Sequence, residues 1–295
     1  MRILISGASG LVGRALQKSL REAKHEVIVL QRGEARPGVA TWDPARGTID
    51  LSAAGRIDAV FHLAGDNISA RRWSAKKKAT ILNSRVDGTN LLARSLASLA
   101  SPPQLFVSAS AVGIYGDRGN EGLHEGSTLG DGFLADVCQQ WEQAAQPAID
   151  GGVRVVYARF GVILDLAGGA LHKMLGPFRL GLGGVLGSGQ QWMSWISLAD
   201  VVAIFHFLLA HQQLAGALNL VAPEAVSNCQ FTKAFGRALK RPTILPMPAF
   251  LVSLLFGEMG RELLLSSAKV EPQELLRCGF HFRHESLQQL LAELT

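Results

Sequence analysis

The stretch SGASGLVG at residues 6–13 places glycines at positions 7, 10 and 13. A short apolar run at 2–5 precedes it and is typical of a buried strand, while apolar residues with helical spacing follow from Leu11. A second strand-like run, HEVIVL, comes next at 25–30. A glycine loop between a strand and a helix is typical of dinucleotide binding, because free N–H groups at the helix N-terminus can bind a pyrophosphate.

The three glycines have separate roles in this interpretation. Gly7 allows a tight turn, Gly10 lets the backbone approach a phosphate, and Gly13 lets the helix pack closely on the sheet. The alternative is a glycine-rich turn that binds no ligand. We predict the following cofactor-binding residues in the loop: Gly7, Ser9, Gly10, Leu11, Val12 and Gly13.

The end of the second strand indicates which dinucleotide binds. An Asp or Glu at this point would hold the ribose 2′-hydroxyl of NAD, but the chain has Gln31 and Arg32. A guanidinium group cannot accept a hydrogen bond from a hydroxyl, and its planar fork suits a phosphate. The sequence therefore predicts NADP(H) rather than NAD. The alternative for Arg32 is a surface arginine beside a glycine turn.

Strand-like and helical patterns alternate along the first half of the chain. Further strand-like runs lie at 58–65, 104–110 and 153–160, and helical patterns lie at about 76–99 and 132–148. This alternation predicts an α/β fold, with a Rossmann-like, doubly wound parallel sheet. Ligands then bind beyond the carboxyl ends of the strands.

The composition of the sequence changes after about residue 165. Glycines become frequent there, and most later patterns are helical. We predict an NADP-binding Rossmann domain over 1–165, to which 197–223 returns as part of the sheet. The remaining segments, 166–196 and 224–295, are predicted to form a smaller, mostly helical lobe that binds the substrate.

The bulk composition favours a protein that binds a small molecule. The formal net charge is +5, and the densest basic stretch, RRWSAKKK at 71–78, has no nucleic-acid recognition motif beside it. The three cysteines are odd in number and widely separated, which argues against a disulfide framework and against a metal site. We therefore expect no nucleic-acid partner and no bound metal.

The chain shows no leader-like segment and no apolar run long enough to span a bilayer. We expect a cytoplasmic protein with no membrane partner, either a monomer or a homodimer.

Further stretches carry a resemblance to a known family. They are WD at 42–43, HLAGDNI at 62–68, RRW at 71–73, NSRVDGT at 83–89, PFRLGLGG at 177–184, GSGQQWMSWI at 187–196, LNLVAP at 218–223 and CGFHF at 278–282. With the glycine loop they resemble the atypical extended short-chain dehydrogenases/reductases of the YfcH-type epimerase family, which carry a C-terminal domain of unknown function. The resemblance covers essentially the whole chain. It implies bound NADP(H) and a small-molecule substrate similar to a nucleotide sugar.

The resemblance also implies further cofactor contacts. Gln31 and Arg32 would lie at the adenosine 2′-phosphate, and Val162 would lie near the nicotinamide. For Arg85 the alternative is an arginine on a helix surface. The implied contacts after the third main strand and beyond are Leu63, Ala64, Gly65, Arg85, Ser108 and Val162.

Active members of this superfamily use a Tyr-x-x-x-Lys pair on one helix face, in which the lysine charge lowers the pKa of the tyrosine. In this chain Phe133 and Val137 fall at those two positions, and neither side chain can transfer a proton. Ser110 matches the catalytic serine of the superfamily, although it could instead be a structural hydroxyl. Tyr115, in the same loop, is predicted to face the crevice and is the candidate replacement acid.

In the second half, Gln190, Gln191 and Trp192 are predicted to contact the substrate, and the alternative is that the tryptophan anchors the core. The sequence is compatible with two functions. One is an NADP-dependent epimerase or reductase with a different proton relay. The other is an NADP(H)-binding sensor or regulatory protein without turnover.

Overall fold

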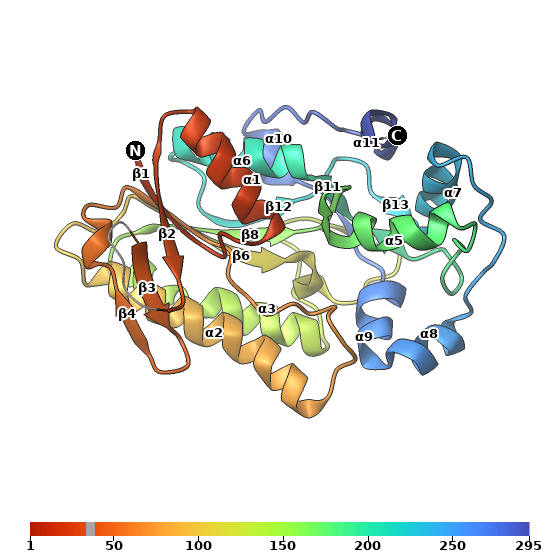
Figure 1. Cartoon of the computed structure of the whole chain (residues 1–295), viewed down its shortest axis with the longest axis horizontal. Coiled ribbons are helices and arrows are strands. Elements are labelled where there is room, and N and C mark those ends of the chain that lie inside the picture. Colours follow the sequence, from red (N-terminus) through yellow and green to blue (C-terminus); the bar gives the residue numbers. More distant parts are fainter. Residues whose placement is uncertain (34–38, 295) are drawn as a thin grey trace.

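A parallel sheet forms the centre of the molecule (Figure 1). The computed structural model describes residues 1–33 and 39–294, and within these ranges the main sheet has eight strands. All neighbouring strands are parallel except the antiparallel pair β3–β4. Their spatial order is β12 (Gly216–Leu220), β8 (Arg154–Phe160), β6 (Leu105–Ala111), β5 (Ala59–His62), β1 (Arg2–Ser6), β2 (Glu26–Gln31), β3 (Val39–Asp43) and β4 (Thr48–Asp50).

The strand order reverses at β1. From β1 the chain first runs to β2 on one side, and later returns to β5 on the other side. In doubly wound sheets this reversal leaves a crevice at the carboxyl ends of the two central strands. The glycine loop follows β1 directly, so it lies at this crevice.

Helices cover both faces of the sheet, as Figure 1 shows. One layer buries Leu16 and Phe205 against Phe61, and the other buries Leu92 against Phe106. Burial on both faces explains why these strands read as continuous apolar runs. The first layer is α1 (Leu11–Glu22), α6 (Leu198–Ala210) and α10 (Gln273–Arg277); the second is α2 (Ala75–Ala97), α3 (Phe133–Gln143) and α4 (Gln146–Asp150).

Side-chain caps determine where several helices begin. The Ser74 hydroxyl accepts the N–H of Lys77 at the start of α2, and the Ser197 hydroxyl accepts the N–H of Asp200 at the start of α6. A reciprocal capping box at Ser227 starts α7 (Asn228–Ala238). Each such bond satisfies a backbone donor that has no partner inside its helix.

The second half of the chain builds its own apolar cluster beside the carboxyl edge of the sheet. Phe178, Phe231, Phe235 and Leu290 pack together there. The helices of this part are α5 (Gly169–Arg179), α7 (Asn228–Ala238), α8 (Ala249–Phe256), α9 (Glu258–Gly260), a π-helical turn (Arg261–Leu265) and α11 (Leu287–Leu294). Small two-stranded sheets pair β9 (Val162–Asp165) with β11 (Trp195–Ser197), β10 (Trp192–Met193) with β13 (Val226–Ser227), and β7 (Gly122–Leu123) with β14 (Lys269–Val270).

The predicted α/β class with a doubly wound parallel sheet is confirmed. No strand is predicted from the sequence between residues 31 and 58, whereas the structure has β3 and β4 there. These strands have five and three residues and form the edge of the sheet, so they carry no long apolar run.

Candidate cofactor crevice

The glycine loop has two positions where only glycine fits. Gly7 has a φ of +70°, and a Cβ there would lie 2.6 Å from the carbonyl carbon of Leu63. A Cβ at Gly13 would lie 2.4 Å from the carbonyl oxygen of Gly7. The first contact holds the loop against the end of β5, and the second holds α1 against the loop. Both are backbone contacts that a side chain cannot relieve by rotating.

Gly10 differs from the other two glycines. A Cβ there would meet only the Gly7 carbonyl oxygen, at 3.3 Å, and the residue is exposed. It precedes α1, whose first N–H groups have no partner within the helix. An exposed backbone beside free N–H groups fits the diphosphate of a dinucleotide.

A buried chain of hydrogen bonds fixes the backbone beside this loop. The Ser6 hydroxyl accepts the N–H groups of Leu63 and Ala64, at 3.2 and 3.3 Å, and lies 2.6 Å from His62 Nδ1. Because both lone pairs of Ser6 are used, its proton goes to Nδ1, and the imidazole carries its own proton on Nε2. That N–H donates to Thr89, at 3.0 Å. Burial lowers the pKa of His62 from 6.5 to about 4, so the ring is neutral at neutral pH.

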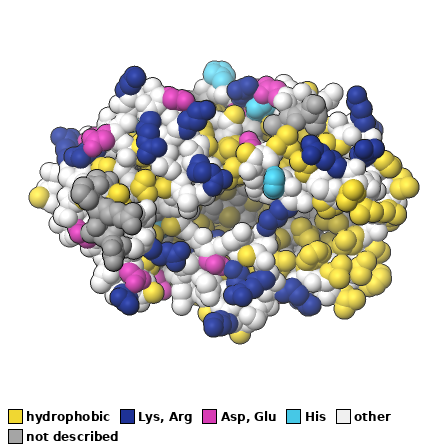
Figure 2. Space-filling model, viewed as in Figure 1, with side chains coloured by type: hydrophobic (Ala, Val, Ile, Leu, Met, Phe, Trp, Pro, Cys, Tyr) yellow, Lys and Arg dark blue, Asp and Glu magenta, His cyan; other side chains and the backbone are white. Residues whose placement is uncertain are grey.

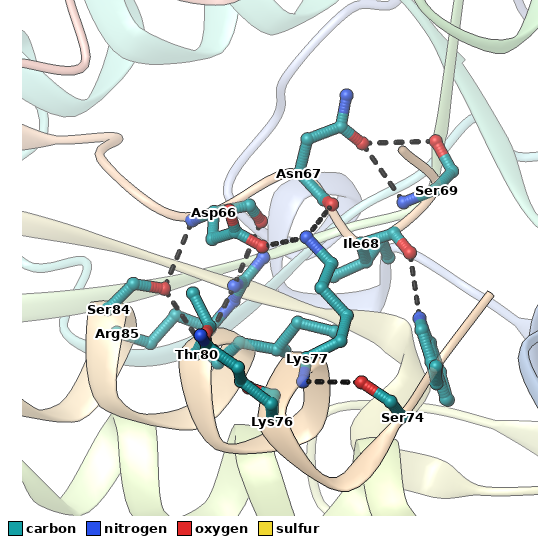
Figure 3. A network of polar contacts seen from close by, with 12 residues as sticks. Asp66, Asn67, Ile68, Ser69, Ser74, Lys76, Lys77, Thr80, Ser84 and Arg85 are labelled. Carbon is teal, nitrogen blue, oxygen red and sulfur yellow. Dashed lines mark hydrogen bonds and ion pairs between the residues drawn. The ribbon is translucent and has the colours of Figure 1, made fainter. Parts of the chain in front are cut away.

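The loop after β5 is held by α2, as Figure 3 shows. Lys77, with only 4% of its side chain exposed, pairs with the Asp66 carboxylate and donates to the carbonyl oxygen of Asn67 at 2.8 Å. The Ser84 hydroxyl accepts the N–H of Asp66, and Arg85 donates to the Asp66 carbonyl oxygen, both at 3.1 Å. This set of bonds positions residues 63–69 along the crevice.

Arg85 is half-buried rather than on an outer helix surface. Its guanidinium carbon lies 4.9 Å from the ring centroid of Trp141, and a Cβ at Gly65 would approach the same guanidinium within 3.3 Å. The predicted residues Leu63, Ala64, Gly65 and Arg85 are therefore brought together beside the glycine loop. Gln31 and Arg32, at the end of the neighbouring strand β2, have exposed side chains.

A buried ionic cluster lies beside Ser110, near the carboxyl end of β6. Ser110, which is 2% exposed, donates to Glu142 Oε1 at 2.7 Å. Arg159 of β8 donates to both carboxylate oxygens of Glu142, through Nε at 2.8 Å and Nη2 at 2.9 Å. A bidentate pair of this kind balances the buried charges and fixes both side chains. Ser110 therefore has an acidic partner that no local sequence motif indicates.

Tyr115 does not face the crevice, and this expectation is wrong. Its side chain is fully buried, donates to Asn219 Oδ1 at 2.8 Å and accepts from Arg159 Nη1 at 2.9 Å. Burial raises the pKa of Tyr115 above its ordinary value of 10, although the nearby Arg159 opposes the shift. A buried phenol with this raised pKa is a poor proton donor at neutral pH.

Aromatic and aliphatic side chains fill the positions of the usual Tyr–Lys pair. Phe133, at the first position of α3, lies edge-on to Trp73 with 5.1 Å between the ring centroids. The Lys78 amino group lies 4.4 Å from the Phe133 centroid, and Val137 is buried. Glu142 is nine residues after Phe133 on α3, so the two residues lie about 13 Å apart along the helix axis. Ser110 bonds to Glu142 and therefore lies away from the position of the usual tyrosine.

The other predicted site residues lie in varied surroundings. Ser108 has no exposed surface, while Val162 is half-buried at the start of β9. Gln191 donates to the carbonyl oxygens of Leu186 and Leu264, so its amide N–H groups support the backbone. The remaining two predicted substrate residues keep some exposure: Gln190 is exposed, and Trp192 is half-buried with its indole N–H donating to Asn120 Oδ1 at 2.8 Å.

Several residues that build the crevice are not among the predicted site residues. In the sequence, Glu142 and Arg159 resemble ordinary residues of a polar helix and of a strand, and His62 belongs to the motif HLAGDNI. VRVVYARF carries two arginines, Arg154 at its start and Arg159 inside it, and an arginine inside such an apolar strand is a signal that a buried partner exists. Nothing in the sequence identified Glu142 as that partner.

A doubly wound sheet with a glycine loop at its switch point defines a Rossmann-type protein. The NAD dependent epimerase/dehydratase family matches residues 3–132, and the domain of unknown function DUF1731 matches residues 247–294. Epimerase family protein Mb2239 of Mycobacterium bovis is 42% identical over 99% of this chain and 97% of its own length. The chain therefore belongs to the epimerase family, within the atypical extended short-chain dehydrogenases/reductases.

Two crystal structures of relatives are similar along nearly the whole chain. Human epimerase family protein SDR39U1 (isoform 2), solved with NADPH, is 36% identical with a TM-score of 0.91, and the match covers 100% of this chain and 99% of that one. The nucleoside-diphosphate sugar epimerase from Corynebacterium glutamicum is 36% identical with a TM-score of 0.81, and the match covers 99% of this chain and 57% of that one. The predicted family resemblance is confirmed.

Proposed function

We propose that this protein binds NADP(H) in the crevice and acts as an oxidoreductase or epimerase on a small molecule similar to a nucleotide sugar. The observation that carries the proposal is the close approach of Gly7 to Leu63, with Arg32 exposed at the end of the next strand. The human relative solved with NADPH and the relative named a nucleoside-diphosphate sugar epimerase support the two parts of the proposal.

The residues present fit this cofactor. The N–H groups at the start of α1 suit its diphosphate, and the Arg32 guanidinium suits the 2′-phosphate. Residues 63–65 and Val162 supply the surface along which the rest of the molecule would lie. When bound, the cofactor supplies or accepts a hydride.

Ser110 and Glu142 are the proposed proton relay. Because Ser110 already donates to Glu142, its oxygen can accept a hydrogen bond from a substrate hydroxyl while its own proton moves toward the carboxylate. Arg159 holds the carboxylate through two bonds, so the acceptor oxygens stay in place. This pair would supply a proton-transfer group at a different position from that of the tyrosine and lysine that the chain lacks.

The cofactor assignment is tested with Arg32→Ala. Loss of a charge-assisted bond to the 2′-phosphate should weaken NADPH binding about 10- to 100-fold and leave NADH binding nearly unchanged. Fluorescence titration of both dinucleotides measures this, with Arg46→Ala as an exposed control in the next hairpin. Equal losses for NADPH and NADH would reject the role of Arg32.

The relay is tested with Glu142→Gln and Ser110→Ala. Both should lower NADPH-linked turnover of nucleoside-diphosphate sugars by 100-fold or more, which is about the size of a lost acid–base group, and leave NADPH affinity intact. Glu121→Gln, which alters an exposed ion pair, is the matched control. Unchanged turnover in Ser110→Ala would reject the relay, even if Glu142→Gln proved unstable.

A second candidate function is NADP(H) binding without turnover. Phe133 and Val137 at the usual catalytic positions and the buried Tyr115 favour it. In this case NADPH should raise the melting temperature, while no hydride exchange occurs with any nucleoside-diphosphate sugar. Detectable exchange that depends on Ser110 would reject this second function.

A further inference from the structure

Large apolar side chains are exposed on one face of the second half of the chain. Figure 2 shows them gathered over α8 and the neighbouring connection, at the lower right of the view. They are between 48% and 76% exposed. We call this set the apolar face: Leu180, Leu182, Ile244, Leu245, Phe250, Leu254 and Leu255.

The apolar face is contiguous although its residues come from two segments. Met247 donates its N–H to the Val185 carbonyl oxygen at 2.8 Å, and Gly187 donates to the Met247 carbonyl oxygen at 2.9 Å. A Cβ at Gly181 would contact the Pro242 ring, at 3.8 Å. The segments 180–187 and 242–249 therefore run side by side, and α8 continues directly from the second.

The segments that supply the apolar face carry charge of one sign. No Asp or Glu occurs in residues 166–199 or 225–257, the segments that supply the face. Four cations line a hollow next to it, between α7 and Pro242, and we call this set the basic hollow: Lys233, Arg237, Lys240 and Arg241. Glu258, the first acidic residue after α8, is ion-paired with Lys78 at 2.7 Å.

We infer that the apolar face docks on a bilayer surface that contains anionic lipids, with a lipid phosphate in the basic hollow. Exposed Phe and Leu side chains enter the boundary between headgroups and acyl chains, and nearby Lys and Arg side chains attract the headgroups. Among the described residues, no helix is long and apolar enough to cross a membrane. This differs from the sequence-based expectation of no membrane partner.

A second copy of the chain fits this face less well. Two copies meeting through the same face would bring their Lys and Arg side chains together without acidic partners, which costs energy through like-charge repulsion. A bilayer with anionic headgroups meets both features at once, because it is apolar below a negatively charged surface.

The test uses the full chain and sedimentation with vesicles. Wild-type protein should bind vesicles of phosphatidylcholine mixed with phosphatidylglycerol, and should bind much less to phosphatidylcholine alone. Phe250→Ser with Leu254→Ser should weaken binding about 100-fold, since two large apolar side chains are lost from the contact. Leu276→Ser, on α10, is the matched control because it is also an exposed leucine.

The charges are tested separately. Arg237→Gln and Lys240→Gln should each weaken binding to the anionic vesicles about five-fold, and added salt should weaken wild-type binding. Lys18→Gln, an exposed lysine on α1, is the control.

Several results would overturn the inference. One is failure of the wild-type protein to bind anionic vesicles, and another is undiminished binding by the double serine variant. Equal binding to both vesicle types would reject the anionic part. A wild-type dimer in light scattering that the double serine variant dissociates would show that a second copy covers the face instead.

Discussion

The two sides of the crevice are built in different ways. On the β1–β5 side the backbone makes the site, because Gly7 and Gly13 allow contacts that no side chain would permit. On the β6–α3 side, polar side chains turn inward and bond to one another, as Ser110 does with Glu142. A glycine loop with the backbone geometry for a dinucleotide can therefore stand beside a helix that carries Phe133 and Val137 at the usual Tyr–Lys positions.

Substitutions in the glycine loop test the β1–β5 side of the crevice, and one of them should give the greatest loss of stability. Gly13→Val should destabilise the protein by about 3 kcal/mol or more, because the new Cβ would lie 2.4 Å from the Gly7 carbonyl oxygen and neither group can move away. Gly10→Ala should leave stability within about 0.5 kcal/mol and weaken only NADPH binding. Urea unfolding and NADPH titration measure the two effects. A fully stable Gly13→Val protein would show that the loop is not tightly packed.

A pH effect tests the link between the two sides, since His62 bonds to Ser6 and, through Thr89, reaches Trp141 of α3. The pKa of His62 is about 4 in the folded protein, below the ordinary 6.5. The unfolded chain therefore binds the proton first as pH falls. The contribution of His62 to the free energy of unfolding is complete above about pH 6.5. It is lost as the pH falls to about 4, a change of about 3 kcal/mol.

His62→Gln should remove this component of the pH dependence. Urea unfolding of both proteins at several pH values between neutrality and pH 4 gives the comparison. If the free energies of unfolding of the two proteins change in parallel with pH, His62 does not carry the effect.

A substitution at Tyr115 tests the β6–α3 side of the crevice and should have a smaller effect on stability. Tyr115→Phe removes the bonds to Asn219 and Arg159 and should cost about 1–3 kcal/mol of stability. NADPH affinity should not change, because the phenol has no exposed surface. Thermal unfolding and NADPH titration check both statements. A large loss of NADPH affinity at unchanged stability would place Tyr115 in the crevice after all.

Much of the fold could be predicted because its signals are local. The alternating apolar runs identified the main strands, and the predicted helix at about 76–99 is close to α2 at Ala75–Ala97. The strands β3 and β4 were missed because they are short and lie at the edge. Boundaries were approximate where one helical pattern at about 132–148 covered both α3 and α4.

The exposure of individual side chains was harder to predict. Tyr115 was assigned to the crevice from its place in a loop, yet the loop forms a short 3-10 helix that turns the ring into the core. Arg85 could be either a surface arginine or a crevice residue until its contact with Trp141 was known. The direction of a side chain from a loop depends on what packs against it, which local sequence does not contain.

Residue types and order were enough to identify the strand–loop–helix unit at 2–22, an arginine in place of an acidic residue at position 32, and the lack of a Tyr–Lys pair. These follow from residue types and short spacings along the chain. The tertiary structure alone decided that Glu142 and Arg159 meet Ser110, and that Leu180 and Phe250 share one exposed face. Such pairs are separated by 17 or more residues, and only the packing of whole strands and helices brings them together.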